Sequence, residues 1–190
     1  MITIGAILWL ALPMVMAGAI HMGIVKRDIF PRLRVPVDGH LTFRGKRLFG
    51  DHKTWRGFLV LITGCMVVMT MQFLLALYYP AVRSIGLFDY TSVNPLYAGA
   101  VLGLGYALGE LPNSFLKRQL EIAPGVTASG ITGLCFLILD QADSVLGCLL
   151  LLPLIWVPSL KVASEILGVC TALHLAFNAS FFLIGIRKRL

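Results

Sequence analysis

The sequence predicts an all-α integral membrane protein with five transmembrane helices. Hydrophobic residues make up 58% of the 190 residues and charged residues only 13%, and the mean hydropathy is +0.87. This balance is far from that of a soluble domain. Several apolar runs also reach the roughly 20 residues that a helix needs to cross the hydrocarbon core of a bilayer. We therefore expect one membrane domain covering residues 1–190.

The apolar runs place five predicted spans in order along the chain. Their approximate bounds are 4–25, 57–79, 95–115, 144–157 and 162–186. The fourth is the shortest and contains Pro153, while residues 131–139 offer further apolar side chains just before it. A broken or re-entrant helix is therefore an alternative interpretation of that region. The segments 26–56 and 116–143 are predicted to be polar loops on the cytoplasmic face.

The orientation follows from the distribution of the sixteen Lys and Arg residues. Nine lie in the segment 26–56, two at 117–118 and three at 187–189. With five spans these segments share one face, and only Arg83 and Lys161 fall on the other. Because cytoplasmic loops are enriched in Lys and Arg, we expect the N-terminus outside and the C-terminus in the cytoplasm. The protein is then a multi-pass component of the cell membrane.

The loop before the second span combines glycine with cationic side chains. Glycine lets the backbone approach a ligand closely, and Lys and Arg can contact several phosphate oxygens at once. A basic loop that touches anionic lipid headgroups is the alternative, which we favour for residues 26–34. For residues 46–57 we favour an anion-binding site. The candidate residues of the whole loop are Asp38, Arg47, Gly50, Lys53, Thr54, Arg56 and Gly57.

Polar residues gather again at the inner end of the third span. Glu110, Asn113, Ser114 and Lys117 recur at spacings of three and four, so a helix would place them on one face. Arg118 follows directly. A carboxylate within a membrane is costly and is by default a functional-site hypothesis. The preceding glycines are better explained by close helix packing than by a nucleotide-binding loop; they are Gly99, Gly103, Gly105 and Gly109.

A pair of carboxylates marks the entrance to the fourth span. Asp140 and Asp143 are three residues apart, which on a helix puts both on one side. Paired oxygen ligands beside a cationic loop suit Mg²⁺, which keeps waters and bridges carboxylates to substrate phosphate. Helix capping by Asp140, with Asp143 in the first turn, is the alternative. In the fifth span, His174 and Asn178 either form an interhelical pair or reach the site, and His21 is interpreted as a packing residue.

This set of side chains indicates a class of chemistry. Carboxylates with Lys and Arg, and no evident Ser, Cys or His nucleophile, favour phosphate chemistry carried out by positioning and charge neutralisation. A lipid phosphate would be the nucleophile and would attack the α-phosphorus of a nucleoside triphosphate. Mg²⁺ and cationic side chains would carry the charge of the leaving pyrophosphate. These considerations do not select the nucleotide.

Taken together, the motifs resemble the CDP-archaeol synthases, membrane cytidylyltransferases related more distantly to the phosphatidate cytidylyltransferases. The resemblance covers most of the chain, in order. It rests on Pro36 to Gly39, Gly45 to Gly50, Lys53 to Gly57, Gly109 with Glu110, Ser114 to Arg118, Pro124 with Gly125, Leu139 to Asp143, and His174 with Asn178. Glu110 stands where the family would have Asp, Gln119 interrupts an expected basic run, and residues 126–139 are longer than the usual link.

The resemblance implies five transmembrane helices and a cytoplasmic site that transfers CMP from CTP to a lipid phosphate, with Mg²⁺ as cofactor and pyrophosphate as product. The implied partners are CTP, a lipid phosphate of the archaeal ether type or a related glycerol phosphate lipid, and membrane lipids, without nucleic acid. The catalytic residues it implies are Lys53, Arg56, Lys117 and Asp143, and the metal ligands are Asp140, Asp143 and Glu110. The substrate-binding residues are Asp38, Arg47, Gly50, Thr54, Gly57, Asn113, Ser114 and Arg118.

Two other functions compete with this interpretation. One is a CDP-alcohol type of lipid phosphotransferase, which displaces CMP instead of installing it; its pattern of spaced aspartates is not found in the sequence. The other is a membrane transporter or scaffold that binds anionic lipid without catalysis. No inverted repeat is evident, and polar clusters on one face suit a site open to one side better than a transport pathway.

Overall fold

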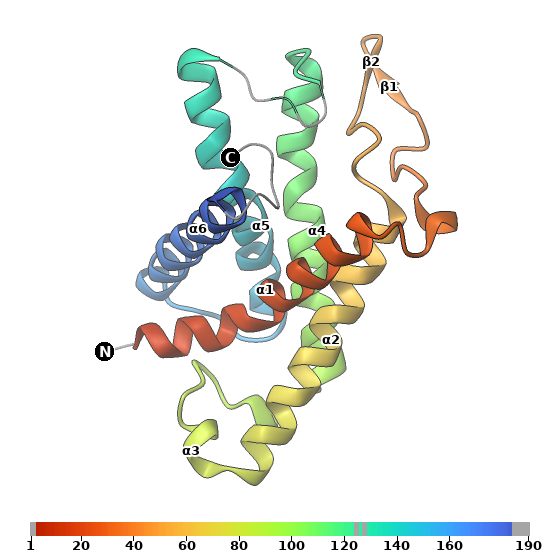
Figure 1. Ribbon diagram of the computed structural model, residues 1–190. Coiled ribbons are helices and arrows are strands. Elements are labelled where there is room, and N and C mark those ends of the chain that lie inside the picture. The colour runs from red at the N-terminus through yellow and green to blue at the C-terminus, as the bar shows by residue number, and fades with distance from the viewer. Residues whose placement is uncertain (1–2, 124–125, 127–128, 184–190) are drawn as a thin grey trace.

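The computed structural model describes residues 3–123, 126 and 129–183, and it is almost entirely helical (Figure 1). The long helices are α1 (Ile4–Lys26), α2 (Trp55–Tyr78), α4 (Pro95–Gln119), α5 (Gly130–Leu151) and α6 (Leu160–Leu183). The short elements are α3 (Pro80–Arg83), the 3-10 helices η1 (Pro31–Leu33), η2 (Tyr90–Ser92) and η3 (Leu152–Leu154), and the strands β1 (Thr42–Phe43) and β2 (Lys46–Arg47). The end of the fifth predicted span and the basic residues at 187–189 lie outside the described residues, as does Pro124 with Gly125.

Four of the long helices have the length and composition to cross a membrane. They are α1, α2, α5 extended through η3 to Leu154, and α6 as far as Ser180. Of the described helices, α4 is equally long, but polar residues toward its C-terminal end lower its hydropathy. The predicted class, an all-helical multi-pass membrane protein, is therefore confirmed.

The fourth predicted span, 144–157, differs from the helix found in this region. Helix α5 begins at Gly130 and continues without a break to Leu151, where η3 begins around Pro153. Much of the loop predicted at 116–143 is consequently helical. The N-cap of α5 is Ser129, so Asp140 lies well inside the helix and does not cap it. The polar residues at 140–144 break the apolar run in the sequence, whereas partners on other helices satisfy them in the fold.

Helix α4 lies between α2 and α5, and its glycines allow the close approach. A Cβ atom on Gly99 or Gly103 would come within 2.5 Å of backbone atoms of α2, and one on Gly105 or Gly109 within 2.9 Å of backbone atoms of α5. On α5, Gly147 leaves similar room for α4. The predicted role of these glycines in helix packing is confirmed. This packing brings the polar end of α4 against the two aspartates of α5.

The segment between α1 and α2 folds back on the end of α4. Strands β1 and β2 pair antiparallel around Arg44 and Gly45, whose positive φ values of 53° and 77° suit a two-residue hairpin turn. The hairpin contacts the C-terminal end of α4, because Lys46 Nζ donates to the carbonyl of Gln119 at 2.7 Å. A cation at this end of a helix also interacts favourably with the helix dipole. The loop is thereby fixed over the polar ends of the helices.

Candidate active site

A cavity of about 1500 Å³ lies between the N-terminal turn of α2 and the helices α1, α4, α5 and α6. Its wall contains both charged and apolar side chains. At one end lie the loop residues 51–54 together with the polar ends of α4 and α5. At the other end the wall is formed by apolar residues of the long helices. A cavity of this kind can hold a charged group and a hydrocarbon segment of the same or of neighbouring ligands.

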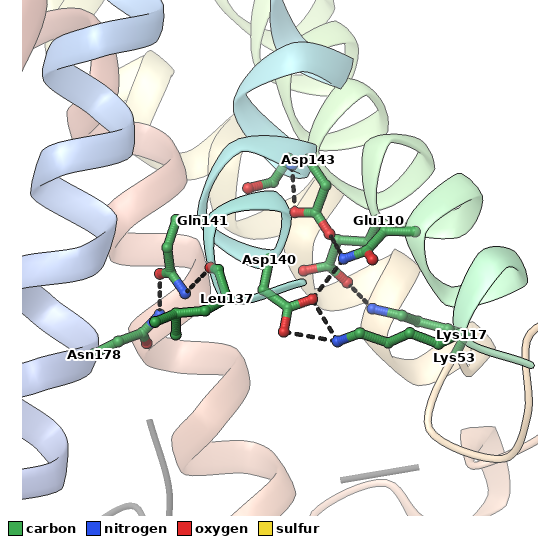
Figure 2. Close-up of polar contacts among 10 residues, drawn as sticks. Lys53, Glu110, Lys117, Leu137, Asp140, Gln141, Asp143 and Asn178 are labelled. Atoms are coloured by element: carbon green, nitrogen blue, oxygen red, sulfur yellow. Dashed lines mark hydrogen bonds and ion pairs between the residues drawn. The ribbon is translucent and has the colours of Figure 1, made fainter. Parts of the chain in front are cut away.

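Asp140 and Asp143 meet a single side chain of α4 (Figure 2). Asn113 Nδ2 donates to Asp140 Oδ1 at 2.6 Å and to Asp143 Oδ2 at 2.7 Å. Lys117 Nζ lies 2.5 Å and 2.7 Å from the two Asp140 oxygens. Asp143 also accepts from the amide of Ser144 at 2.6 Å. Four predicted site residues from two helices therefore form one hydrogen-bonded cluster.

Glu110 is occupied by a different cation. Its carboxylate forms an ion pair with Lys53, which comes from the loop just before α2. Glu110 and Lys117 stand on the same face of α4, and each pairs with a partner from another part of the chain (Figure 2). Each lysine is thus held beside the cavity by a carboxylate. An anionic ligand would replace these carboxylates as the partner of the lysines.

Arg56 is buried in the first turn of α2 and fixes the end of α1. Its Nη1 donates to Asp28 Oδ1 at 2.7 Å and to the carbonyl of Ile29 at 3.1 Å. The hydrogen bond from Arg56 lowers the pKa of Asp28, and the nearby Arg34 lowers it further. Both Arg56 and Asp28 line the cavity. The predicted catalytic residue Arg56 therefore has a clear role in holding the loop.

Asp38 organises the loop from within. Its buried carboxylate accepts from the amides of His40, Phe49 and Gly50 and from Arg47 Nη2 at distances of 2.8–3.1 Å. Burial by itself would raise the pKa of Asp38, but the hydrogen bonds from Arg47 and the three amides outweigh it and lower the pKa to about 2. The carboxylate is therefore ionised at neutral pH and stabilises the loop that carries Lys53.

The cavity brings together most, but not all, of the predicted residues. Those that line it are Lys53, Thr54, Arg56, Glu110, Asn113, Ser114, Lys117, Arg118, Asp140 and Asp143. Four predicted substrate-binding residues are not part of its wall: Asp38, Arg47, Gly50 and Gly57. The hydroxyl of Thr54 also caps α2 by accepting from the amide of Gly57 at 3.3 Å. The residues outside the wall support the loop instead of meeting the cavity.

The cavity also contains residues that were not selected from the sequence, among them His21, Asp28, His52 and Gln141. Asn178 Nδ2 donates to Gln141 Oε1 at 2.5 Å. Gln141 lies between the two aspartates on α5, so this bond ties α6 to the helix that carries them. Asn178 therefore forms an interhelical hydrogen bond, the first of its two alternatives, and its side chain also lines the cavity. In the sequence, the position of Gln141 next to Asp140 could have indicated that it belongs to the cavity wall.

The oxygen atoms at the contact of α4 and α5 fit Mg²⁺. In the described part of the chain, no group of three or more His, Cys, Asp and Glu able to hold a metal is found. Mg²⁺, however, needs only one or two carboxylates, since waters and substrate phosphates complete its shell. Asp140 and Asp143 converge on one atom, and among the described residues the buried Asn113 Oδ1 has no hydrogen-bond partner. Asp140 and Asp143 supply two carboxylates, and Asn113 Oδ1 would join them if the amide were reversed; Asp140 is ion-paired with Lys117 and Glu110 with Lys53.

Fold and site together define a class: a multi-pass helical membrane protein whose cavity joins carboxylates and cations to an apolar wall. The model of the CDP-archaeol synthase family, described as CarS-like, matches residues 2–189. The chain belongs to the CDP-archaeol synthase family. The resemblance found in the sequence is thus confirmed, and with it the assignment to the cytidylyltransferase enzymes.

Individual relatives support this assignment. The CDP-archaeol synthase of Thermofilum pendens is 32% identical over 96% of this chain and 78% of its own length. That of Methanococcoides burtonii is 32% identical over 80% of this chain and 88% of its own. That of Pyrococcus furiosus is 39% identical, over 54% of this chain and 56% of its own. No solved structure matches the chain.

Proposed function

We propose that this protein transfers CMP from CTP to a membrane lipid phosphate, forming a CDP-lipid and pyrophosphate. The acceptor is a lipid phosphate of the archaeal ether type or a related glycerol phosphate lipid. One observation carries the proposal: Asp140, Asp143, Asn113 and Lys117 form a single cluster beside a cavity with a large apolar wall. Family membership supports the same reaction, since the relatives are CDP-archaeol synthases.

The reaction is a displacement at phosphorus. An oxygen of the lipid phosphate forms a bond to the α-phosphorus of CTP, while the bond from the α-phosphorus to the oxygen that bridges to the β-phosphate breaks. The electron pair leaves with pyrophosphate. Because such reactions depend on positioning and on neutralising charge, the residues expected to act are those that bind and align the two phosphate groups.

Cations beside the cavity suit the binding of both substrates. Lys53 follows the glycine-containing loop and would contact the triphosphate. The negative charge of the triphosphate would then replace Glu110 as the partner of Lys53. Lys117 and Arg118, from the last turn of α4, would contact the phosphates nearer to α5. Arg118 Nε is buried without a hydrogen-bond partner among the described residues. A phosphate oxygen would satisfy it.

Mg²⁺ is the proposed cofactor, with Asp140, Asp143 and the amide oxygen of Asn113 as its protein ligands. When bound there, the ion would neutralise charge on the triphosphate and on the leaving pyrophosphate. For this to occur, Lys117 must release Asp140 and the Asn113 side chain must turn its oxygen toward the carboxylates. The Asn113 amide would reverse about its terminal torsion and Lys117 would adopt another rotamer; both side chains line the cavity.

The proposed topology has five crossings, with α4 as the fifth spanning helix. Helix α4 has 25 residues, similar to its neighbours, and packs along α2 and α5 through glycine contacts. Because α1 alone precedes the loop 26–56, the loop lies on the side opposite the N-terminus, and a crossing by α4 after that of α2 returns residues 117–118 to the same side as the loop. The excess of Lys and Arg in residues 26–56 and at 117–118 favours a cytoplasmic location for the loop and the polar end of the cavity. CTP would then enter from the cytoplasm of the cell.

The direct test is Mg²⁺-dependent pyrophosphate release from CTP by the purified protein. The acceptors are an ether-linked isoprenoid glycerol phosphate, ordinary phosphatidic acid, or no lipid. Release with one lipid identifies the acceptor class. No pyrophosphate release by a folded protein would refute the proposal. Release of CMP from a supplied CDP-lipid and an alcohol acceptor would then indicate a CDP-alcohol type of transferase, and no turnover of either substrate pair would favour the non-catalytic transporter or scaffold.

Variants distinguish a loss of catalytic activity from a loss of folding. Asp143→Asn should reduce turnover by at least roughly 100-fold, because it removes charge where the metal and the developing charge are held. Asp89→Asn is the matched control, since Asp89 pairs with Arg83 in the loop between α2 and α4 and does not line the cavity. Thermal stability and gel filtration of both variants report the fold. Wild-type turnover by a folded Asp143→Asn protein would exclude the proposed metal role.

A further inference from the structure

The cavity wall changes from apolar to polar along two of the helices that line it, α1 and α6. On α1, Leu10 and Met14 line the cavity first and His21 follows two turns later. On α6, Ile166 and Cys170 are followed by His174. The two helices thus each present hydrocarbon toward one end of the cavity and an imidazole where the polar end begins.

The two other long walls show the same change. On α4, Leu102 lines the apolar part and Glu110 lies two turns further along. On α5, which runs in the opposite direction, Leu149 lines the apolar part and Asp143 the polar part. The four helices therefore define a boundary that surrounds the cavity. A ligand with a phosphate head and long chains would match this boundary, since each part would meet a wall of its own kind.

The two histidines connect this boundary to the parts of the site that hold substrate. His174 Nδ1 lies 3.3 Å from the carbonyl oxygen of Gln141, the residue after Asp140. His21 lies against the first turn of α2, where a Cβ on Gly57 would come within 3.2 Å of His21 Nε2. One imidazole is thus beside the proposed metal ligands and the other beside the start of α2, which follows Lys53 directly.

The charge at the boundary permits an anion. Glu110 is the carboxylate of α4 at this level, and it interacts electrostatically with His21 and His174 as well as with Lys53. Before CTP binds, its ion pair with Lys53 offsets its negative charge. A phosphate monoester carries about 1.5 to 2 negative charges near neutral pH and can accept hydrogen bonds from an imidazole N–H. In His174 the donor to phosphate would be Nε2 of the protonated ring, because Nδ1 faces the carbonyl oxygen of Gln141.

We propose that His21 and His174, from two different helices of the cavity wall, bind the phosphate of the acceptor lipid, with the lipid chains along the apolar part of the wall. This inference rests on the proposed function and adds to it the acceptor subsite. It explains the change from apolar to polar side chains along the four helices, because a lipid entering from the membrane would stop where its phosphate reaches the two imidazoles. There the phosphate oxygen would lie next to the cluster of Asp140 and Asp143, and CTP would approach from the loop.

The test compares the two substrates in kinetics of purified His21→Asn and His174→Asn proteins. The wild-type assay uses CTP, Mg²⁺ and whichever of phosphatidic acid or ether-linked isoprenoid glycerol phosphate supports pyrophosphate release. Loss of one hydrogen bond to a charged group is worth about 1.5 kcal/mol or more, so KM for the lipid should rise about tenfold in each variant. KM for CTP should stay within about twofold of the wild type.

A matched control is His40→Asn. His40 is exposed, lies in the loop outside the cavity wall and has a φ of 66°, which asparagine also adopts readily. Its KM values for both substrates should equal those of the wild type. His21→Asn is the safer of the two test variants for folding, because the hydrogen bonds found among the described residues include none from the His21 side chain, whereas His174 contacts the carbonyl of Gln141. Melting temperatures identify any variant with a damaged fold.

Unchanged KM for the lipid in both variants, or an equal rise in KM for CTP, would overturn the assignment of the histidines. A failure of the proposed function itself would give a different result, because the wild-type protein would then release no pyrophosphate with either lipid. Activity in the wild type with unaltered lipid dependence in the variants would therefore refute the histidine subsite alone.

Discussion

Replacing Asp38 by Asn would test whether this residue supports the loop or contacts the substrate. Its side chain is fully shielded from solvent and accepts four hydrogen bonds, three of them from backbone amides. The bonds hold its pKa at about 2, below the ordinary value of 3.8. A difference of about 1.8 in pKa corresponds to about 2.5 kcal/mol, at 1.36 kcal/mol per pKa unit. This is the contribution of the charge to the closed loop.

The sign of the pH dependence follows from the direction of the shift. Because the pKa of Asp38 is lower in the folded loop than in an open one, its contribution is fully present above about pH 3.8 and is lost as the pH falls through about 2. At neutral pH the wild-type loop therefore retains the whole contribution. Asp38→Asn removes the charge at every pH. At pH 7 the loop of this variant should therefore be as unstable as the wild-type loop becomes only in strong acid.

Amide hydrogen exchange measures this loss directly. A decrease of about 2.5 kcal/mol in the free energy of local opening corresponds to roughly 70-fold faster exchange at Phe49 and Gly50, two of the amides that Asp38 accepts from. Asp51→Asn is the control, because Asp51 is exposed and also pairs with Arg47, at 2.9 Å. An exposed ion pair is worth at most about 1 kcal/mol. Exchange at Phe49 and Gly50 as slow as in the wild type, combined with weaker CTP binding, would refute the supporting role of Asp38.

Two further predictions concern packing around α4. Gly103→Ala should lower the melting temperature in detergent, because its Cβ would come within 2.5 Å of Ile62 Cα and overpacking costs about 1–3 kcal/mol. The control is Gly168→Ala, whose Cβ would meet nothing within 4 Å and should leave the melting temperature unchanged. Equal stability of the two variants would contradict the close packing. Lys46→Met should speed amide exchange in the last turn of α4 several-fold, since it removes a 2.7 Å hydrogen bond to Gln119 worth about 0.5–1.5 kcal/mol, whereas unaltered exchange would show that the hairpin does not stabilise this helix end.

The sequence by itself predicted the class of protein and many of the polar residues that line the cavity. Hydropathy alone indicates a helical membrane protein, because long apolar segments are stable in a bilayer only as helices or closed barrels. The clusters at Lys53, Glu110 and Asp140 stood out because charge is costly near a membrane. Spacing also placed Asn113 and Lys117 on one face of a helix, where both contact Asp140.

Local patterns misplaced the start of α5 for a physical reason. Asp140, Gln141 and Asp143 interrupt the apolar run, so hydropathy favours a short span beginning after them. In the fold, Asn113 and Asn178, on two different helices, satisfy these polar groups, and the helix passes through without a break. A window along one segment contains no information on the partners that other segments supply.

Only the tertiary structure decided which charged residues support the fold and which face the cavity. Asp38 and Lys53 belong to the same loop, yet one is enclosed by backbone amides and the other reaches Glu110, 57 residues away along the chain. Arg56 likewise finds its partner in Asp28, at the end of another helix. Composition and spacing determine that such groups must be satisfied, because an unpaired buried charge is costly. The partner of each group depends on the three-dimensional packing of the helices, which local sequence does not contain.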